Sequence, residues 1–118
     1  MRVAIAPEDR TRYDYLYALI GQIPGDASVA AAEMLVAHVS SRKNAYTLMH
    51  GHFDADYLLT RSPPAGQDRE RLIAALRSGA YGLVAERGER EKGAFALFRR
   101  GAPAATAQAY LRSINVEP

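Results

Sequence analysis

The fold is decided by residues 19–46, which read LIGQIPGDASVAAAEMLVAHVSSRKNAY. This stretch holds the end of an amphipathic helix, a turn signal at 24–26, a short apolar run at 28–32 and a second helix that starts at Glu33. A brief run of valine and alanine between a turn and a helix is typical of a strand that is covered on both faces. We therefore expect a central strand here, with one helix before it and one after it.

Helices and strands alternate in the rest of the chain. The other expected helices run from Pro7 to about residues 21–24, over 67–77 and after Pro103, and the other expected strands are 45–49, 55–60, 81–86 and 94–98. This order predicts an α/β fold, a small three-layer Rossmann-like open sheet of four to five strands. The sheet should be mainly parallel, with an antiparallel C-terminal hairpin and helices on both faces.

An open sheet of this kind places its ligand crevice beyond the carboxyl ends of its central strands. In this sequence those ends fall near Ala32-Glu33 and near Thr60-Arg61-Ser62. Arg61 is therefore a candidate ligand-binding residue.

Composition limits the class of protein. The chain has 118 residues, of which 48% are apolar and 24% charged, which fits one compact α/β domain over residues 1–118. It has no cysteine, so disulfides, thiolate metal sites and a cysteine nucleophile are excluded. Its longest apolar stretch, residues 27–39, is shorter than the roughly 20 residues that cross a bilayer. If the chain is complete as given, it is expected in the cytoplasm.

Charge and motifs argue against several functions. Residues 61–100 are mildly basic, but their arginines alternate with acidic residues, so we expect no nucleic-acid partner. The first strand leads into Ala30-Ala31-Ala32-Glu33, not into a glycine-rich phosphate loop, so no nucleotide or other cofactor is expected. No serine lies in a nucleophile elbow, and no catalytic residue can be assigned.

Three spaced motifs resemble a known family. They are Leu-Ile-x-x-Ile-Pro-x-x-Ala-Ser-Val over 19–29, Leu-Val-x-His-Val-Ser-x-Arg over 35–42 and Ala-Asp-Tyr-Leu-Leu over 55–59, and residues 80–84 and 97–101 are similar to the family's closing hairpin. The pattern resembles the soluble C-terminal segment of a family of predicted polytopic prokaryotic membrane proteins of unknown function. That family is distantly similar to membrane-embedded glycosyltransferases of the GT-C type.

The resemblance implies a setting for this chain. It would be a non-catalytic extracytoplasmic domain, a fragment of a longer protein that resides in the cell membrane. Its partners would be the transmembrane part of that parent protein and a lipid-linked sugar or acceptor. In glycosyltransferases of this architecture the catalytic carboxylate lies between early transmembrane helices, which this chain lacks. The parent protein would then be the glycosyltransferase, and not this fragment.

The alternative is a free-standing small enzyme or a ligand- or metal-binding protein. Its metal site would use His50, His52 and Asp54, which alternate along the chain and would point to one side of an extended segment. The simpler interpretation of these residues is a polar loop between two strands.

A second polar cluster comprises His38, Ser40 and Arg42 at the expected end of the helix that begins at Glu33. These residues could cap the helix, since basic groups interact favourably with a helix C-terminus. Alternatively, Arg42 could bind a phosphate or carboxylate, with His38 donating beside it. Tyr13 and Tyr17, one turn apart in the first helix, are expected to pack in the core, with an aromatic sugar platform as the alternative.

Overall fold

The computed structural model describes residues 7–40, 42, 44–52 and 54–118, with side chains from Tyr13 onward except that of His50. The elements in chain order are α1 (Pro7–Ile20), β1 (Val29–Ala31), the 3-10 turn η1 (Glu33–Leu35), α2 (Val36–Val39), β2 (Ala45–Thr47), the 3-10 turn η2 (Leu48–His50), β3 (Tyr57–Ser62), α3 (Gly66–Arg77), β4 (Tyr81–Glu89), β5 (Gly93–Arg100) and α4 (Ala104–Ser113). The predicted α/β class is confirmed.

The strands of this described part form one mixed five-stranded sheet in the order β2-β1-β3-β5-β4. Strand β1 pairs in parallel with β2 on one side and with β3 on the other. Strand β5 runs antiparallel to β3 and to β4, with a bulge in β4 between Leu83 and Ala85. Parallel pairs joined through helical turns and a hairpin at the other edge follow from the spacing of the apolar runs.

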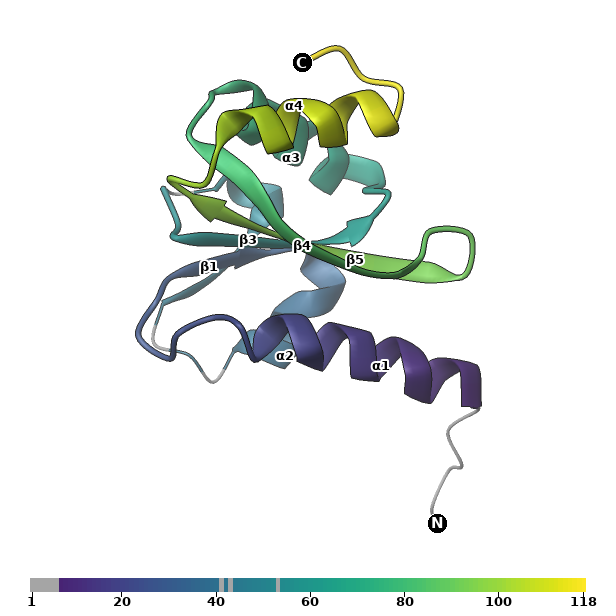
Figure 1. Ribbon diagram of the computed structural model, residues 1–118. Coiled ribbons are helices and arrows are strands. Elements are labelled where there is room, and N and C mark those ends of the chain that lie inside the picture. Colours follow the sequence, from purple (N-terminus) through teal and green to yellow (C-terminus); the bar gives the residue numbers. More distant parts are fainter. Residues whose placement is uncertain (1–6, 41, 43, 53) are drawn as a thin grey trace.

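Helices cover both faces of the sheet (Figure 1). Helices α3 and α4 lie on one face, and α1 and α2 lie on the other. We call these the α3/α4 face and the α1/α2 face. Val29, Ala30 and Ala31 of β1 are all fully buried, as expected for a strand between two helical layers.

Each face has its own core. The buried aromatic rings of the α3/α4 face are those of Tyr81, Phe98 and Tyr110, whereas Phe95 is the one on the α1/α2 face among the described residues. The rings of Phe98 and Tyr110 meet edge to face, with centroids 5.1 Å apart. The α3/α4 face is therefore closed by larger side chains than the α1/α2 face.

The buried stripe of α1 differs from the expected one. Leu16, Leu19 and Ile23 pack in the core, whereas Tyr13 is 42% exposed and Tyr17 is 51% exposed. The expectation that the two tyrosines pack in the core is therefore wrong. Aromatic residues with a polar tip tolerate such a half-exposed position, so helical spacing alone could not separate them from true core residues.

A polar clip joins the amino ends of the parallel strands β1 and β3. The carboxylate of Asp56 accepts hydrogen bonds from the backbone N–H of Ser28 at 3.0 Å and from its hydroxyl at 3.1 Å. The backbone N–H of Asp56 donates in return to Ser28 Oγ at 2.8 Å. Reciprocal bonds of this kind fix the register between the two strands.

Candidate functional site

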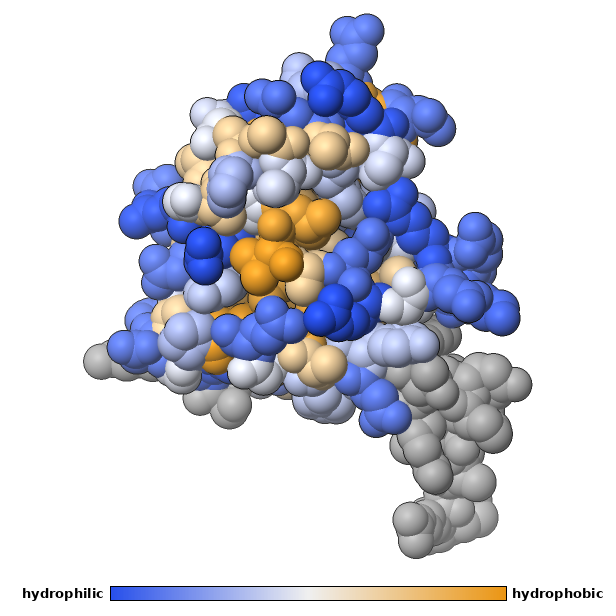
Figure 2. Space-filling model, viewed as in Figure 1, coloured by the Kyte–Doolittle hydropathy of each residue, from blue (hydrophilic) through white to orange (hydrophobic). Residues whose placement is uncertain are grey.

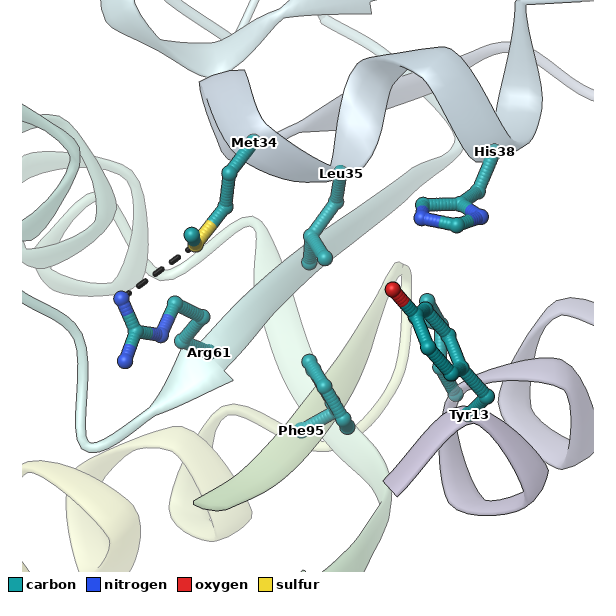
Figure 3. A pocket seen from close by; sticks show the side chains of 7 residues that line it. Tyr13, Met34, Leu35, His38, Arg61 and Phe95 are labelled. Carbon is teal, nitrogen blue, oxygen red and sulfur yellow. Dashed lines mark hydrogen bonds between the residues drawn. The ribbon is translucent and has the colours of Figure 1, made fainter. Parts of the chain in front are cut away.

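A pocket of about 110 Å³ lies on the α1/α2 face, where β1 and β3 end. It is lined by Tyr13, Leu16, Met34, Leu35, His38, Arg61 and Phe95. Met34, Leu35 and His38 reach it from η1 and α2, Arg61 and Phe95 from the sheet, and Tyr13 from α1 (Figure 3). This is the sheet edge at which the sequence predicts a ligand crevice.

Arg61 is the charged group of this pocket. Its side chain is exposed, and Nη1 donates to the thioether sulfur of Met34 at 3.2 Å. A thioether is a weak acceptor and carries no charge. None of the ion pairs between described residues includes Arg61. The pocket therefore presents a guanidinium whose charge is not neutralised within the described chain.

The other end of the pocket is aromatic. The hydroxyl of Tyr17 lies 2.8 Å from His38 Nδ1, and the Tyr13 and Tyr17 rings approach the imidazole with centroids 5.7 Å and 5.5 Å away. Because Nδ1 is paired with Tyr17, Nε2 is the ring nitrogen left for another partner. These contacts fix the position of His38 and leave one face of Tyr13 at the pocket.

A second hollow of about 350 Å³ lies beyond Arg61. It shares Arg61 and Phe95 with the first pocket, and residues 90–94 at the tip of the β4–β5 hairpin add Arg90, Glu91 and Lys92 to its lining. Arg61 therefore separates a hollow lined by aromatic and aliphatic side chains from a charged one.

A partly buried polar network lies on the opposite side of the same strand end. The Ser62 hydroxyl donates to Glu86 and lies 2.8 Å from the Tyr110 hydroxyl. Arg90 donates to both carboxylate oxygens of Glu86, at 2.8 Å and 3.1 Å, and its guanidinium lies over the Tyr110 ring. The sequence did not predict this network, because its residues come from β3, β4, the hairpin tip and α4.

The network shifts the pKa values of its members. Burial alone would raise the pKa of Glu86, but the hydrogen bonds from Arg90 and Ser62, with the charge of Arg90, lower it below its usual value. Burial raises the pKa of Tyr110, against the opposing hydrogen bond from Ser62. Glu86 is therefore held as a carboxylate in contact with a cation, which is a stabilising arrangement.

An acidic pair lies at the carboxyl end of β1. The backbone N–H of Glu33 donates to Asp68 at 3.4 Å, and the other carboxylate oxygen of Asp68 has no partner among the described residues. Burial raises the pKa of Asp68, and the nearby charge of Glu33 acts in the same direction. The sheet edge thus carries both signs of charge.

The sequence-predicted ligand residues separate into two groups. His38 and Arg61 line the same pocket. Arg42 does not line it: its guanidinium donates to the carbonyl groups of Ile20, Ile23 and Pro24 at 3.3, 3.1 and 2.6 Å. Ser40 donates to the carbonyl of Ala37 at 3.1 Å. Arg42 therefore caps the end of α1, a different helix from the one that precedes it in sequence.

The histidine segment has its own local contacts. His52 Nδ1 accepts the backbone N–H of Asp54 at 3.2 Å and lies 3.9 Å from its carboxylate, and the His52 ring packs edge to face on Tyr81. Burial raises the pKa of Tyr81 to about 12, and its hydroxyl donates to the carbonyl of Ala55 at 2.7 Å.

No group of three or more metal-ligating side chains is present among the described residues, and the side chain of His50 lies outside them. The predicted metal site therefore remains a prediction.

Sequence reasoning missed Met34 and Phe95 as pocket residues. Met34 follows β1 at the predicted crevice, and it is 57% exposed. Phe95 opposes Arg61 in the β3–β5 pairing, which could be found only once that pairing was known.

Comparisons with other proteins give no relative. No family model matches the sequence, and no curated protein and no solved structure matches it significantly. Among the described residues, no helix is long and apolar enough to span a membrane.

Proposed function

We propose that this chain is a non-catalytic extracytoplasmic domain of a glycosyltransferase-like integral membrane protein. The proposal starts from the resemblance of its spaced motifs to the soluble segment of such proteins. It is supported by the contacts that residues of those motifs make with one another in the fold. The main observation is that Arg42 of the second motif holds the helix end formed by the first motif.

Arg42 of the second motif binds carbonyl groups of the first motif that lie 18 to 22 residues before it in sequence. Its three bonds reach carbonyl groups at the end of α1, where a helix leaves its last carbonyls without intrahelical partners. A guanidinium is well suited to this place, since it carries a charge and several donors in a fixed plane. The Ile-Pro and His-Val-Ser-x-Arg motifs thus form one structural unit.

The remaining motifs are also structural. Ser28 of the first motif and Asp56 of the third form the clip between β1 and β3. In the closing hairpin, a Cβ at Gly82 would lie 2.5 Å from the carbonyl oxygen of Pro103, so only glycine fits where the chain passes toward α4. A pattern built from such residues describes a fold, and it favours a supporting domain over an enzyme.

The proposal includes the arrangement of the sheet and its helices. We infer the predicted three-layer Rossmann-like relationship, in which β2, β1 and β3 are the parallel part of the sheet and β4 and β5 are the antiparallel C-terminal hairpin. The proposed partners are the transmembrane part of the parent protein and a lipid-linked sugar or acceptor bound beside it.

The reading frame upstream of the codon for Met1 tests the proposal. We expect this frame to continue without a stop codon and to encode several hydrophobic segments of about 20 residues. An in-frame stop codon with a ribosome-binding site between it and Met1 would overturn the proposal.

Protease treatment of intact spheroplasts tests the side of the membrane. An epitope tag inserted after Glu91, at the exposed hairpin tip, should be cleaved by external protease if the domain is extracytoplasmic. A cytoplasmic marker protein is the control and must stay intact. A tag that is protected until the membrane is lysed would contradict the proposed location.

A further inference from the structure

We propose that the pocket between Tyr13, Met34, His38, Arg61 and Phe95 binds a small organic acid that joins a flat ring to a carboxylate or phosphate group. This inference concerns the pocket alone and goes beyond the proposed membrane setting, so either proposal can fail without the other.

Exposed apolar side chains are concentrated around this pocket. Five large apolar side chains are exposed in the described part of the chain. Two of them, Tyr13 and Met34, line this pocket, and a third, Tyr17, bonds to His38 in its wall. Single exposed apolar residues need no explanation, but a group of them around a hollow indicates a surface that a ligand covers.

The size and shape of the pocket suit a single flat ring. An apolar protein cavity of about 150 Å³ is large enough to bind benzene. The pocket here measures about 110 Å³ and opens to the surface, so it can take most of one ring with an edge left outside. The rings of Tyr13 and Phe95 supply flat walls, and the unbranched side chain of Met34 can adjust to the ligand (Figure 3).

The positive charge of Arg61 suits an acidic ligand. Arg61 borders the pocket, and its hydrogen-bond acceptor there is a thioether, which a carboxylate or phosphate oxygen would replace with a stronger, charge-assisted bond. The planar guanidinium can bind either acid group through two parallel bonds.

The second hollow adjoins Arg61 on the side away from the first pocket. Glu91 and Lys92 both border it; the Lys92 side chain is 80% exposed, and its ammonium pairs with Glu89 at 3.3 Å. A ligand with its ring beside Tyr13 would direct its acid group toward Arg61 and this charged hollow. The ring of the ligand is thus inferred from the pocket beside Tyr13, and its acid group from Arg61.

Chemical-shift titration of the full chain with defined probes tests the inference. Benzoate and phenyl phosphate combine a ring with an acid, acetate has the acid without the ring, and benzyl alcohol has the ring without the acid. We expect saturable shifts at the backbone amides of Met34, His38, Arg61 and Phe95 with both ring acids. The affinity for acetate and benzyl alcohol should be lower by about tenfold or more, because each makes half of the contacts.

Variants locate the binding. Arg61→Gln should weaken binding of both ring acids by about tenfold or more. Arg112→Gln removes the same charge from an exposed position on α4 and should leave binding unchanged. Met34→Glu places a carboxylate next to Arg61 at an exposed position and should also block the probes, which provides a second test if Arg61→Gln fails to fold. The thermal unfolding curve of each variant checks its folding.

Two outcomes would overturn the inference. One is the lack of saturable shifts with either ring acid up to about 10 mM. The other is binding that Arg61→Gln and Met34→Glu leave unchanged, or that Arg112→Gln weakens equally. Binding of phenyl phosphate alone would still support the site and would identify phosphate as the acid group.

Discussion

Arg61 and Ser62 are neighbours on β3, yet their side chains lie on opposite faces of the sheet and differ in burial and in hydrogen-bond partners. Ser62 is 2% exposed and lies in a network in which every polar group has a partner. Arg61 is exposed, and it donates a hydrogen bond to the thioether of Met34. The comparison shows that one strand end contributes stability on the α3/α4 face and leaves an unmatched charge on the α1/α2 face.

The largest expected effect concerns the aromatic rings of β5. Phe98 is fully buried in the α3/α4 core, and Phe98→Ala should lower the free energy of unfolding by about 3–5 kcal/mol, because it leaves a closed cavity. Phe95 borders two open hollows, so Phe95→Ala should cost less, about 1.5–3 kcal/mol. Urea unfolding of both variants measures the difference. Equal losses would remove the distinction between the two faces.

The second prediction concerns how α1 is held on its smaller core. Arg42→Ala leaves three carbonyl groups without their charged donor and should lower the free energy of unfolding by about 1.5–3 kcal/mol. Arg112→Ala removes an exposed side chain that has no polar partner among the described residues, and it should change the free energy of unfolding by less than about 0.5 kcal/mol. Denaturant titrations provide both values. If the two variants match, the capping role of Arg42 is wrong.

The third prediction uses the lowered pKa of Glu86. Because this pKa is lower in the folded state than in the unfolded state, the carboxylate stabilises the fold above the unfolded value of 4.5. That contribution is lost as the pH falls through the folded value. Glu86→Gln should therefore cost about 1–2 kcal/mol at pH 7 and progressively less below pH 4.5. Unfolding measured from pH 7 to pH 3 checks this, and a difference independent of pH would contradict it.

The fourth prediction concerns Thr60, a polar residue of β3 whose side chain lies on the α3/α4 face. Thr60 is fully buried, and its hydroxyl has no partner among the described residues. Thr60→Val removes that hydroxyl at nearly constant shape and should raise the free energy of unfolding by about 1 kcal/mol. Ser62→Ala is the contrasting control and should destabilise, because its hydroxyl is paired. A stabilising Ser62→Ala would show that the network contributes nothing.

The smallest expected effect is that of Arg61 on stability. Arg61→Gln should alter the free energy of unfolding by less than about 0.5 kcal/mol, since the side chain is exposed and has no ionic partner among the described residues. A thermal melt checks this. A loss as large as that of Arg42→Ala would make Arg61 a structural residue and would weaken the case for a ligand there.

The sequence predicted the helices well where caps were clear. The limits of α3 lie within one residue of the expected 67–77, and α1 begins at the expected Pro7 but ends at Ile20, before the expected 21–24. The third expected strand, 55–60, is Tyr57–Ser62 in the structure, because Asp56 belongs to the clip with Ser28. The hairpin strands extend to Glu89 and from Gly93, since charged residues can continue a solvent-exposed ladder that hydropathy does not detect.

The site was predictable in part. Arg61 follows from the position of the strand end, and His38 from its place in a polar cluster. Tyr13 lines the same pocket as Arg61 and His38 because of the way α1 packs on the sheet. The spacing of apolar residues in a helix does not predict that packing. The destination of Arg42 was also hidden, because a guanidinium at the end of one helix can reach the carbonyl groups of another.

The two outer helices lie on opposite faces of the sheet, α1 on one and α4 on the other (Figure 1), and the exposed apolar patch over β4 separates them (Figure 2). A mechanical load applied through the two ends of the chain would therefore act across the layers, and not along the strands. Such a load peels a helix from its core before it strains the hydrogen bonds of the sheet. Because fewer buried aromatic rings lie beneath it, α1 is the element that we expect to detach first, although Arg42 holds its end.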